Sequence, residues 1–353
     1  MNRDPRSTLL YILICLVYSS SLYAQQESKD TLAFRIMSYN VENLFDCRHD
    51  TLKNDYEFLP DALRHWNYFK YRKKLNAIAR TLIAVGGWTP PALVALCEVE
   101  NDSVLFDLTR HSVLRETGYR YVMTQSPDER GVDVALLYRR ELFKLLSFRS
   151  IPVKKVSRSN RPTRDILHVS GLLLNHDTLD IFVVHFPSRH GGAKTSEPYR
   201  LSAARQLKDA ADSLLRTRRL PQIIIMGDFN DYPHNRSIRK ILMAEPPPAS
   251  TSSLSPDKLY HLLAGKCGKH AGSYKYRGEW GLLDHIIVCG HLLQTDAPLQ
   301  ADQHKAGIFR PSYLLTDDSD YGGKQPFRTY HGMKYLGGYS DHLPVWAELR
   351  LIY

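Results

Sequence analysis

The sequence lacks several features that mark other classes of protein. Five cysteines occur among 353 residues and none lies in a CxxC pair, which excludes a zinc framework. No internal repeat and no low-complexity tract is present, which excludes a repeat architecture and a disordered linker protein. The apolar run at residues 9–17 is too short to cross a bilayer comfortably. With 43% hydrophobic residues, the chain can instead form the core of one large domain.

The N-terminus has the composition of an export signal. Arg3 and Arg6 precede the apolar run, and small residues lead up to Ala24. A basic head, a short hydrophobic region and a small-residue cleavage site predict a signal peptide over residues 1–24, and an uncleaved anchor is the alternative. We therefore expect a single domain over residues 25–353 that is exported to the periplasm or the cell exterior, with no transmembrane segment in the mature chain.

The four cysteines beyond the N-terminal run could pair in an exported protein. Cys97 lies in an apolar run and is expected to pack as a small hydrophobic residue. Cys267 and Cys289 flank a plausible hairpin, so they are the expected pair.

The charge is strongly positive, with 47 Lys and Arg against 37 Asp and Glu and a formal net charge of +10 at pH 7. A basic surface favours polyanions, which include nucleic acid, anionic lipid headgroups and phosphorylated small molecules. The alternative explanation is surface charge that serves solubility alone.

Apolar runs of strand length outnumber helical patterns. Apolar residues recur at helical spacing in residues 68–85 and 197–215, and a shorter helix is expected at 238–243. This balance favours a mixed α+β layered fold over a doubly wound parallel sheet. Residues 295–338 are long and irregular, and such a segment is more often functional than idle. The expected strands are 34–39, 93–96, 134–138, 169–174, 179–185, 223–226, 282–288 and 343–351.

Two polar side chains at the ends of early strands suit a metal ion. Glu98 ends an otherwise apolar run, and Asn40 follows another. Oxygen ligands of this kind suit Mg²⁺ or Mn²⁺. Glu100 lies two residues further on, on the same side of the strand by the alternation of side chains, and is a weaker candidate for a metal ligand. Alone, Glu98 could be a solvated strand end and Asn40 a turn cap.

Later strand ends carry groups for proton transfer and phosphate contact. Asp228 and Asn230 are separated by one residue, so their side chains point to the same side if the strand continues. A carboxylate there can accept a proton from water while the amide holds that water or a phosphate oxygen. His185 and His342 could donate hydrogen bonds to a phosphate, and the apolar flanks of Asp284 mean that this carboxylate needs a partner.

Together these segments resemble the endonuclease/exonuclease/phosphatase superfamily, whose fold is that of deoxyribonuclease I. The resemblance covers almost the whole chain after residue 24, and it implies a four-layer α/β/β/α sandwich of two mainly antiparallel sheets with the site at one edge. The Gly-Asp-x-Asn and terminal Ser-Asp-His segments are the most specific. In chain order, the matching segments are 39–41, 96–98, 184–188, 227–230, 283–285 and 340–342.

The resemblance also implies a role for each matching metal-site residue. Glu98 looks like the principal metal ligand, with Asn40 beside it and Asp341 assisting. The implied cofactor is Mg²⁺ or Mn²⁺. One departure is visible, because the family often has Gln before this Glu and here the position is Cys97.

For the chemical step, the resemblance implies that Asp228 positions or deprotonates water. Asn230 and His185 look like phosphate-site groups. His342 looks like the histidine that contacts the scissile phosphate, with Asp284 as its orienting carboxylate.

Basic side chains near these segments could grip substrate phosphates. Arg189 follows His185 closely in sequence, and Arg161 and Arg164 lie upstream. Asp133 is a further candidate, as a partner for His185.

Three functions are compatible with these residues. The leading hypothesis is an exported metal-dependent phosphodiesterase, most simply an endonuclease that cleaves DNA or RNA. The second is a phosphoesterase for phospholipid headgroups or inositol phosphates, and the third is a secreted binding protein without catalysis. Several side chains could contact bases, a nucleic-acid backbone or a membrane. They could equally pack against the domain or be solvated. They are residues 70–74, Tyr313, Tyr321, Phe327, Tyr330 and Tyr335.

Overall fold

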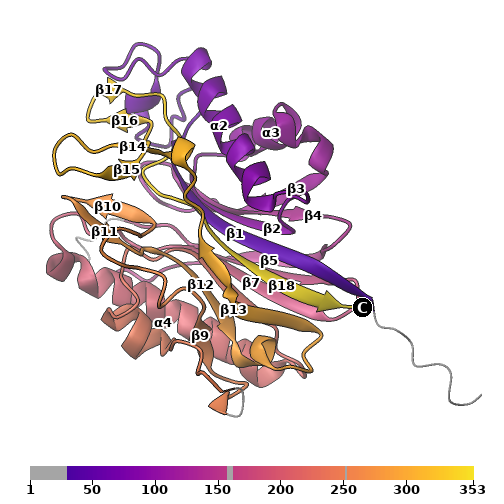
Figure 1. Ribbon diagram of the computed structural model, residues 1–353. Helices are drawn as coiled ribbons and strands as arrows, with labels where there is room; N and C mark the ends of the chain where they lie inside the picture. Colours follow the sequence, from indigo (N-terminus) through magenta and orange to yellow (C-terminus); the bar gives the residue numbers. More distant parts are fainter. Residues whose placement is uncertain (1–29, 157–161, 251–252) are drawn as a thin grey trace, which may run out of the picture.

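Two six-stranded sheets pack face to face in the computed structural model, which describes residues 30–156, 162–250 and 253–353 (Figure 1). Helices α2 (Tyr68–Gly86) and α3 (Asp102–Arg110) cover the outer face of the first sheet, and α4 (Ala193–Thr217) covers the second. The predicted four-layer α/β/β/α sandwich is therefore confirmed. The predicted signal peptide lies outside the described residues.

The first sheet has the strand order β13-β18-β1-β2-β4-β3. Only β1 and β2 run parallel, and every other neighbouring pair is antiparallel. The strands are β1 (Thr31–Leu44), β2 (Leu93–Val99), β3 (Tyr119–Met123), β4 (Asp133–Arg139), β13 (Leu299–Ile308) and β18 (Val345–Ile352).

The second sheet repeats this plan, with the order β5-β6-β7-β8-β12-β9 and one parallel pair, β7 with β8. In each sheet the chain between the two parallel strands contains the long helix that covers that sheet, α2 or α4. The strands are β5 (Lys144–Ile151), β6 (Ile166–Leu172), β7 (Thr178–His185), β8 (Ile223–Asp228), β9 (Leu259–His261) and β12 (Asp284–Cys289).

Strand alternation explains why two separate cores form. In β1, Phe34 and Ile36 belong to the core between the sheets, whereas Met37 and Tyr39 pack toward α2 and α3. Successive side chains of a strand point to opposite faces, so a strand that is apolar on both faces must be covered on both. All four of these side chains are fully buried.

The helices begin and end at residues that satisfy their terminal backbone groups. The Asn67 side chain accepts a hydrogen bond from Lys70 N at the start of α2. At its end, Gly87 takes a φ of 66°, a left-handed conformation that glycine adopts readily. Helix α4 begins at Ala193, four residues before the predicted start at 197, and it contains Pro198 as its sixth residue. The predicted helix at 238–243 is a π-helical segment, η3 (Ser237–Leu242).

The prediction of an irregular segment over residues 295–338 is wrong in part, because β13 is a ten-residue edge strand. Its pairing with β18 is interrupted between Ala301 and Ala306, and the bulge breaks the apolar alternation that would have marked a strand. The remainder forms two short hairpins, β14 (Leu315–Asp317) with β15 (Lys324–Pro326) and β16 (Tyr330–His331) with β17 (Lys334–Tyr335). A third hairpin, β10 (Tyr274–Tyr276) with β11 (Glu279–Gly281), precedes them in sequence.

The expected disulfide between Cys267 and Cys289 is also wrong, since all four cysteines among the described residues are free. Cys289 ends β12 inside the core, where its thiol donates to the carbonyl of Pro221, while Cys267 is exposed in a loop. Cys97 is buried, as predicted, and its thiol donates to the carbonyl of Val184. Among the described helices, none combines the length and apolarity that a membrane crossing needs.

Candidate active site at the paired sheet edges

The predicted polar residues meet at one edge of the sandwich. Asn40 of β1 pairs in register with Cys97, next to Glu98 of β2. In the second sheet, His185 ends β7 and pairs with Asp228, which ends β8. Because the carboxyl ends of parallel strands lie at the same edge, each parallel pair delivers its polar residues together, and the packing of the sheets joins the two groups.

The backbone around this edge takes unusual conformations. Eight non-glycine residues among those described have positive φ, and four of them, Glu42, Asn43, Glu98 and Asn230, lie at this edge. At Glu98 the φ of 67° coincides with a break in register between Cys97 and Val99, which turns the carboxylate out of the strand. Such conformations cost about 1–3 kcal/mol each and concentrate at functional sites.

Close strand approach explains the glycine before Asp228. Gly227 has a φ of 147°, and a Cβ atom there would lie 1.9 Å from the carbonyl oxygen of Val184. Only glycine lets β8 approach β7 this closely. This contact sets the position at which Asp228 leaves the strand.

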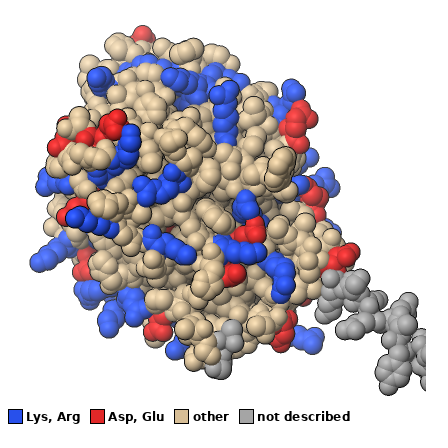
Figure 2. All heavy atoms as spheres, viewed as in Figure 1, with Lys and Arg blue, Asp and Glu red and all other residues tan. Residues whose placement is uncertain are grey.

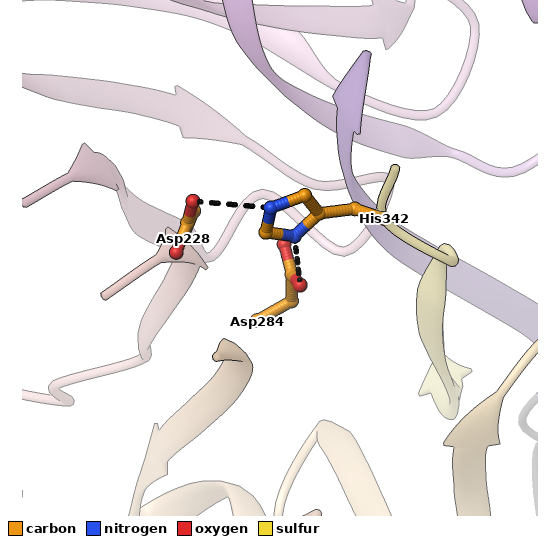
Figure 3. A group of neighbouring side chains, drawn as sticks. All are labelled: Asp228, Asp284 and His342. Atoms are coloured by element: carbon orange, nitrogen blue, oxygen red, sulfur yellow. Dashed lines mark hydrogen bonds and ion pairs between the residues drawn. The ribbon is translucent and has the colours of Figure 1, made fainter. Parts of the chain in front are cut away.

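A buried histidine links two carboxylates of the second sheet (Figure 3). His342 Nδ1 lies 2.7 Å from Asp284 Oδ2, and its Nε2 lies 3.8 Å from Asp228 Oδ2. Burial opposes a charged imidazole, but the carboxylates of Asp284 and Asp228 outweigh burial and raise the pKa of His342 well above its usual value. The contact to Asp284 also orients the ring, with Nε2 toward Asp228.

Asn40 and Ser340 connect the two sheets at this edge. The Asn40 amide donates to Asp228 Oδ2 at 3.0 Å and to Glu98 Oε1 at 3.4 Å. Ser340 donates its hydroxyl proton to the carbonyl of Asn40 and accepts a hydrogen bond from the backbone N–H of His342. The serine of the Ser-Asp-His segment therefore holds His342 against the end of β1.

Asn230 and His185 border the site on the side of the second sheet. The backbone N–H of Asn230 donates to Asp228 Oδ1 at 2.8 Å, and its side chain donates to the carbonyl of Phe186. His185 Nε2 lies 3.6 Å from Asp228 and 3.8 Å from Glu98. Burial, reinforced by nearby cationic side chains, lowers the pKa of His185 well below its usual value, so the ring is neutral.

The donor atoms at this edge fit a hard divalent cation. Glu98, Asp228 and Asp341 supply carboxylates, and Asn40 supplies an amide that joins two of them. Burial raises the pKa of Asp228 to about 7, and burial with the neighbouring Glu42 raises the pKa of Asp341 to about 6. Burial disfavours the charged form of both carboxylates, and a bound cation would favour it.

A second group of possible ligand atoms lies on Asp228, Asp284 and His342, within 4.8 Å of one another. His342 Nδ1 and Asp284 already satisfy each other through a 2.7 Å contact. The oxygen-rich set around Glu98 is therefore the better match to Mg²⁺ or Mn²⁺, which prefer carboxylate and amide oxygens over imidazole.

Four residues that border this site were not predicted from the sequence. Glu42 accepts hydrogen bonds from the backbone N–H of Thr329 and from Arg328 Nε, and Lys74 Nζ lies 3.7 Å from it. Arg328 also donates to Asp341. The ring of Tyr274 lies 4.8 Å from that of His342.

Lys74 is the one of these four that the sequence pattern could have revealed. It was assigned to a solvated or backbone-following stretch at residues 70–74, yet it is 1% exposed. It precedes Leu75 and lies four residues before Ile78 on the apolar stripe of α2, so helical spacing places it on the buried face.

The three candidate arginines have different surroundings. Arg164 is 5% exposed, and its guanidinium donates to Asp128 and to the carbonyl of Phe186. Arg189 lies beside the site, where its Nε donates to the carbonyl of Asn230 at 2.8 Å. Arg161 lies outside the described residues.

Two further carboxylates take roles other than those expected. Asp133 accepts hydrogen bonds from the Thr124 hydroxyl and the Ser126 backbone, so the expected pairing with His185 is wrong. Glu100 accepts from the backbone N–H of Asp46, away from Glu98, and burial raises its pKa to about 8.

Comparison with known proteins places this arrangement in a family. A model described as "Endonuclease/Exonuclease/phosphatase family" matches residues 35–351. Among curated proteins, none matches this chain significantly.

Solved structures share the fold at low sequence identity. An endonuclease/exonuclease/phosphatase family protein from Bacteroides thetaiotaomicron is 15% identical, with a TM-score of 0.57 over 91% of this chain and 99% of that one. Humanized D. rerio TDP2 is 16% identical, with a TM-score of 0.53 over 90% of this chain and 98% of that one. A mannosyl-6-phosphatase from Bacteroides thetaiotaomicron is 16% identical, with a TM-score of 0.53 over 90% and 99%.

Proposed function

We propose that this chain, which belongs to the endonuclease/exonuclease/phosphatase family, is a divalent-metal-dependent phosphodiesterase that cleaves DNA or RNA. Membership makes it a phosphoester hydrolase. One observation supports the metal-dependent mechanism. Glu98 and Asn40 from one sheet meet Asp228, Asp284 and His342 at the edge of the other. Carboxylates, an amide and an oriented histidine are the groups that metal-assisted phosphoester hydrolysis needs.

The cation-binding residues in this proposal are Glu98, Asn40 and Asp341. When bound, Mg²⁺ or Mn²⁺ would neutralise the charge that develops on the phosphate oxygens. The chain supports such an ion through fixed backbone, because Asn43 N donates to Glu98 Oε2 at 2.9 Å. Arg328 holds Asp341 from the outer side.

Asp228 is the residue that we assign to the attacking water. It lies between the Asn40 amide, the Asn230 backbone N–H and the two histidines, so its oxygens are held in place. A buried carboxylate is a stronger base than an exposed one, which favours transfer of a water proton to it. The Asn230 side chain lies close enough to fix the same water or a phosphate oxygen.

His342 is the residue that we assign to the phosphate. Its Nε2 faces the site and Asp284 favours the charged ring, so it can donate a charge-assisted hydrogen bond to a phosphoryl oxygen. Neutral His185 can donate one ordinary hydrogen bond from the opposite side. The two histidines thus contact the transferred group without competing for one proton.

Nucleic acid is the favoured substrate because of charge. The formal net charge is +10, and the face in Figure 2 carries many Lys and Arg side chains and fewer acidic ones. Binding to a polyanion should weaken steeply with salt. At 15–16% identity, the activities that the names of solved relatives state do not transfer to this chain.

The test is a substrate panel with purified protein that lacks residues 1–24. Plasmid DNA, single-stranded RNA, phospholipid vesicles, inositol phosphates and mannose 6-phosphate are incubated with Mg²⁺ or with a chelator. We expect cleavage of nucleic acid that the chelator and His342→Ala both abolish. Cleavage that survives both changes would contradict the mechanism, and hydrolysis of lipid or sugar phosphate alone would replace the substrate. Binding without hydrolysis of any substrate would favour a binding protein.

We also propose that the chain is exported and that cleavage follows Ala24. N-terminal sequencing of the protein from its native cell fractions checks this. Recovery in the cytosol with residues 1–24 intact would contradict it.

A further inference from the structure

A groove of about 830 Å³ runs between the hairpin β10–β11 and the hairpin β14–β15, and the site described above does not use it. We call it the Trp280 groove. Its lining includes four cations, two aromatic residues and one carboxylate: Lys269, Lys275, Arg310, Lys324, Trp280, Tyr321 and Glu279. In the view shared by Figures 1 and 2, basic and acidic side chains lie together over these hairpins.

The groove offers cations that are not locked into the fold. Lys269 is exposed, and its side chain forms no ion pair with the residues that the structure describes. Lys324 pairs with Asp317, but both side chains are more than half exposed, so a ligand can displace this pair at little cost. Arg310 is exposed and donates one hydrogen bond to the carbonyl of His270.

Two aromatic side chains stand among these cations. Trp280 is partly buried on β11, and Arg310 lies over its ring at 5.5 Å. Tyr321 is 59% exposed on the facing loop. Of the five aromatic residues proposed from the sequence to contact bases or a membrane, Tyr321 is the one that lines this groove, whereas Tyr330 is buried.

Contacts between the two hairpins hold the walls of the groove together. The Lys275 side chain is 4% exposed, and its Nζ lies 2.6 Å from Asp318 and donates to the carbonyl of Gly322. This buried contact ties the two hairpins together. Gly278 at the tip of the first hairpin lies against Tyr321, where a Cβ atom would come within 2.9 Å of the tyrosine. A preformed groove loses little entropy when a ligand binds.

A continuous surface leads from the groove to the catalytic edge. Arg189, which donates to the carbonyl of Asn230, lies over the ring of Tyr232 at 4.1 Å. Tyr232 lines a second cavity of about 510 Å³, and the two cavities share Cys267, Glu279 and Trp280. The path therefore runs from Asn230 past Tyr232 to Trp280 and into the groove.

We infer that the Trp280 groove binds the single-stranded part of a nucleic acid that extends beyond the scissile phosphate, with a base against Trp280 and phosphates near Lys324 and Arg310. Successive bases stack on aromatic faces while cations follow the backbone, and this groove combines both features. The inference rests on the proposed function, because it names where the rest of that substrate lies.

Binding of labelled oligothymidylate to the full mature chain tests the inference, with chelator present so that nothing is cleaved. Trp280→Ala should weaken binding of an oligomer of about 12 nucleotides roughly five- to hundredfold, the effect of losing one stacked base. An oligomer of about 3 nucleotides is shorter than the roughly 4–16 nucleotides that single-strand sites cover, and it should bind nearly equally to both proteins. Trp280→Phe keeps an aromatic face and should restore most of the affinity.

Matched controls come from the same chain. Trp88 is fully exposed after α2, and Trp88→Ala should leave oligonucleotide binding unchanged. Lys324→Ala should lower the slope of log affinity against log salt by roughly 0.7, the share of one phosphate contact on a single strand. Lys305 is 61% exposed and paired with Glu348, much as Lys324 is with Asp317, and Lys305→Ala should not change the slope.

The outcomes separate this inference from the proposed function. Equal losses in Trp280→Ala for both oligomer lengths, or equal losses in Trp88→Ala, would overturn the groove as a strand-binding site. Loss of binding to anionic vesicles but not to oligonucleotides would also overturn it. Binding that depends on Trp280 in a protein that cleaves no nucleic acid would support the groove and contradict the nuclease function. Hydrolysis of bis(p-nitrophenyl) phosphate should be the same in Trp280→Ala and wild type, because this small ester does not reach the groove.

Discussion

The two sheets reach the same edge with the same topology and with different chemistry. Each has one central parallel pair joined through a long covering helix, and each pair ends in a carboxylate, Glu98 in the first sheet and Asp228 in the second. On the first-sheet side, Glu42 has Lys74 and Arg328 as charged neighbours, Glu98 has His185 at 3.8 Å, and the backbone is strained at three positions. Around Asp228 the neighbours are histidines.

This difference indicates a division of labour. Arg328 keeps its charge in the neutral range and holds the carboxylates of Glu42 and Asp341, so the first sheet presents a fixed arrangement of oxygen ligands suited to holding a cation. Histidines and a buried carboxylate exchange protons, so the second sheet is suited to the chemical step. In the proposed mechanism, the fold thus places a binding half and a reacting half face to face.

The largest effect should come from breaking the reacting half. Asp284→Asn keeps the shape of the side chain but removes the charge that holds His342, and we expect kcat to fall roughly 10²–10⁴-fold. The pKa of His342, followed by NMR of its ring protons, should fall as well, because its main stabilising carboxylate is gone. His331→Ala, at an exposed histidine on β16, is the control and should leave kcat unchanged. A wild-type kcat in Asp284→Asn would refute the orienting role.

A smaller effect should come from the binding half. Glu98→Gln should raise the Mg²⁺ concentration for half-maximal activity at least about tenfold, because a charged ligand is lost. Glu100→Gln is the matched control two residues away. With a pKa of about 8, Glu100 is mostly protonated at neutral pH, so glutamine preserves its charge and its acceptor. Activity titrated with Mg²⁺ measures both, and similar shifts in the two variants would contradict the assignment of Glu98.

The smallest effect concerns the structure behind the reacting half. His261 Nε2 and His285 Nδ1 lie 2.5 Å apart in the core, and His285 Nε2 donates to the carbonyl of Asp231, next to Asn230. Burial lowers the pKa of His285 to about 4 and that of His261 well below its usual value. The unfolded chain, with His near about 6.5, therefore binds more protons than the folded chain as pH falls from about 6.5 toward 4.

Stability should accordingly be full above about pH 7 and decline through that acidic window. Urea unfolding between about pH 7.5 and pH 4.5 measures the decline. His261→Gln removes one titrating ring and should flatten the profile, at a cost of about 1–3 kcal/mol at neutral pH for the lost hydrogen bonds. A profile of the same steepness in wild type and His261→Gln would show that the histidine pair does not produce it.

Local patterns were sufficient for the residues at strand ends. Asn40, Glu98, His185, Asp228 and Asn230 end or follow predicted apolar runs. His342 precedes one such run and Asp284 lies near the start of another, and the structure brings all seven residues together at one edge. This worked because the strands are buried on both faces, so a polar residue at a strand end is conspicuous against an apolar run. The π-helical and bulged elements were not predicted correctly, because the spacing of their apolar residues follows neither the helical nor the strand period.

Residues that depend on distant partners could not be predicted in this way. Arg328 reaches Glu42 across 286 positions of the sequence, and Ser340 reaches Asn40 across 300. The Trp280 groove joins Trp280, Arg310 and Tyr321 through two hairpins whose short strands carry too few residues for a periodic pattern. Asp133 pairs locally with Thr124 because β3 and β4 are neighbours, and nothing in its own segment shows that.

The sequence by itself determined the layered α+β class, the family resemblance and the set of side chains with chemistry, because apolar periodicity and short motifs are local properties. Only the tertiary structure decided which of those side chains meet. It also decided that Cys267 and Cys289 stay apart, that Lys74 is buried against Glu42, and that a cationic, aromatic groove continues from the site. These outcomes depend on how two sheets pack and how hairpins fold across their edge, and contacts of that range are set by the whole chain.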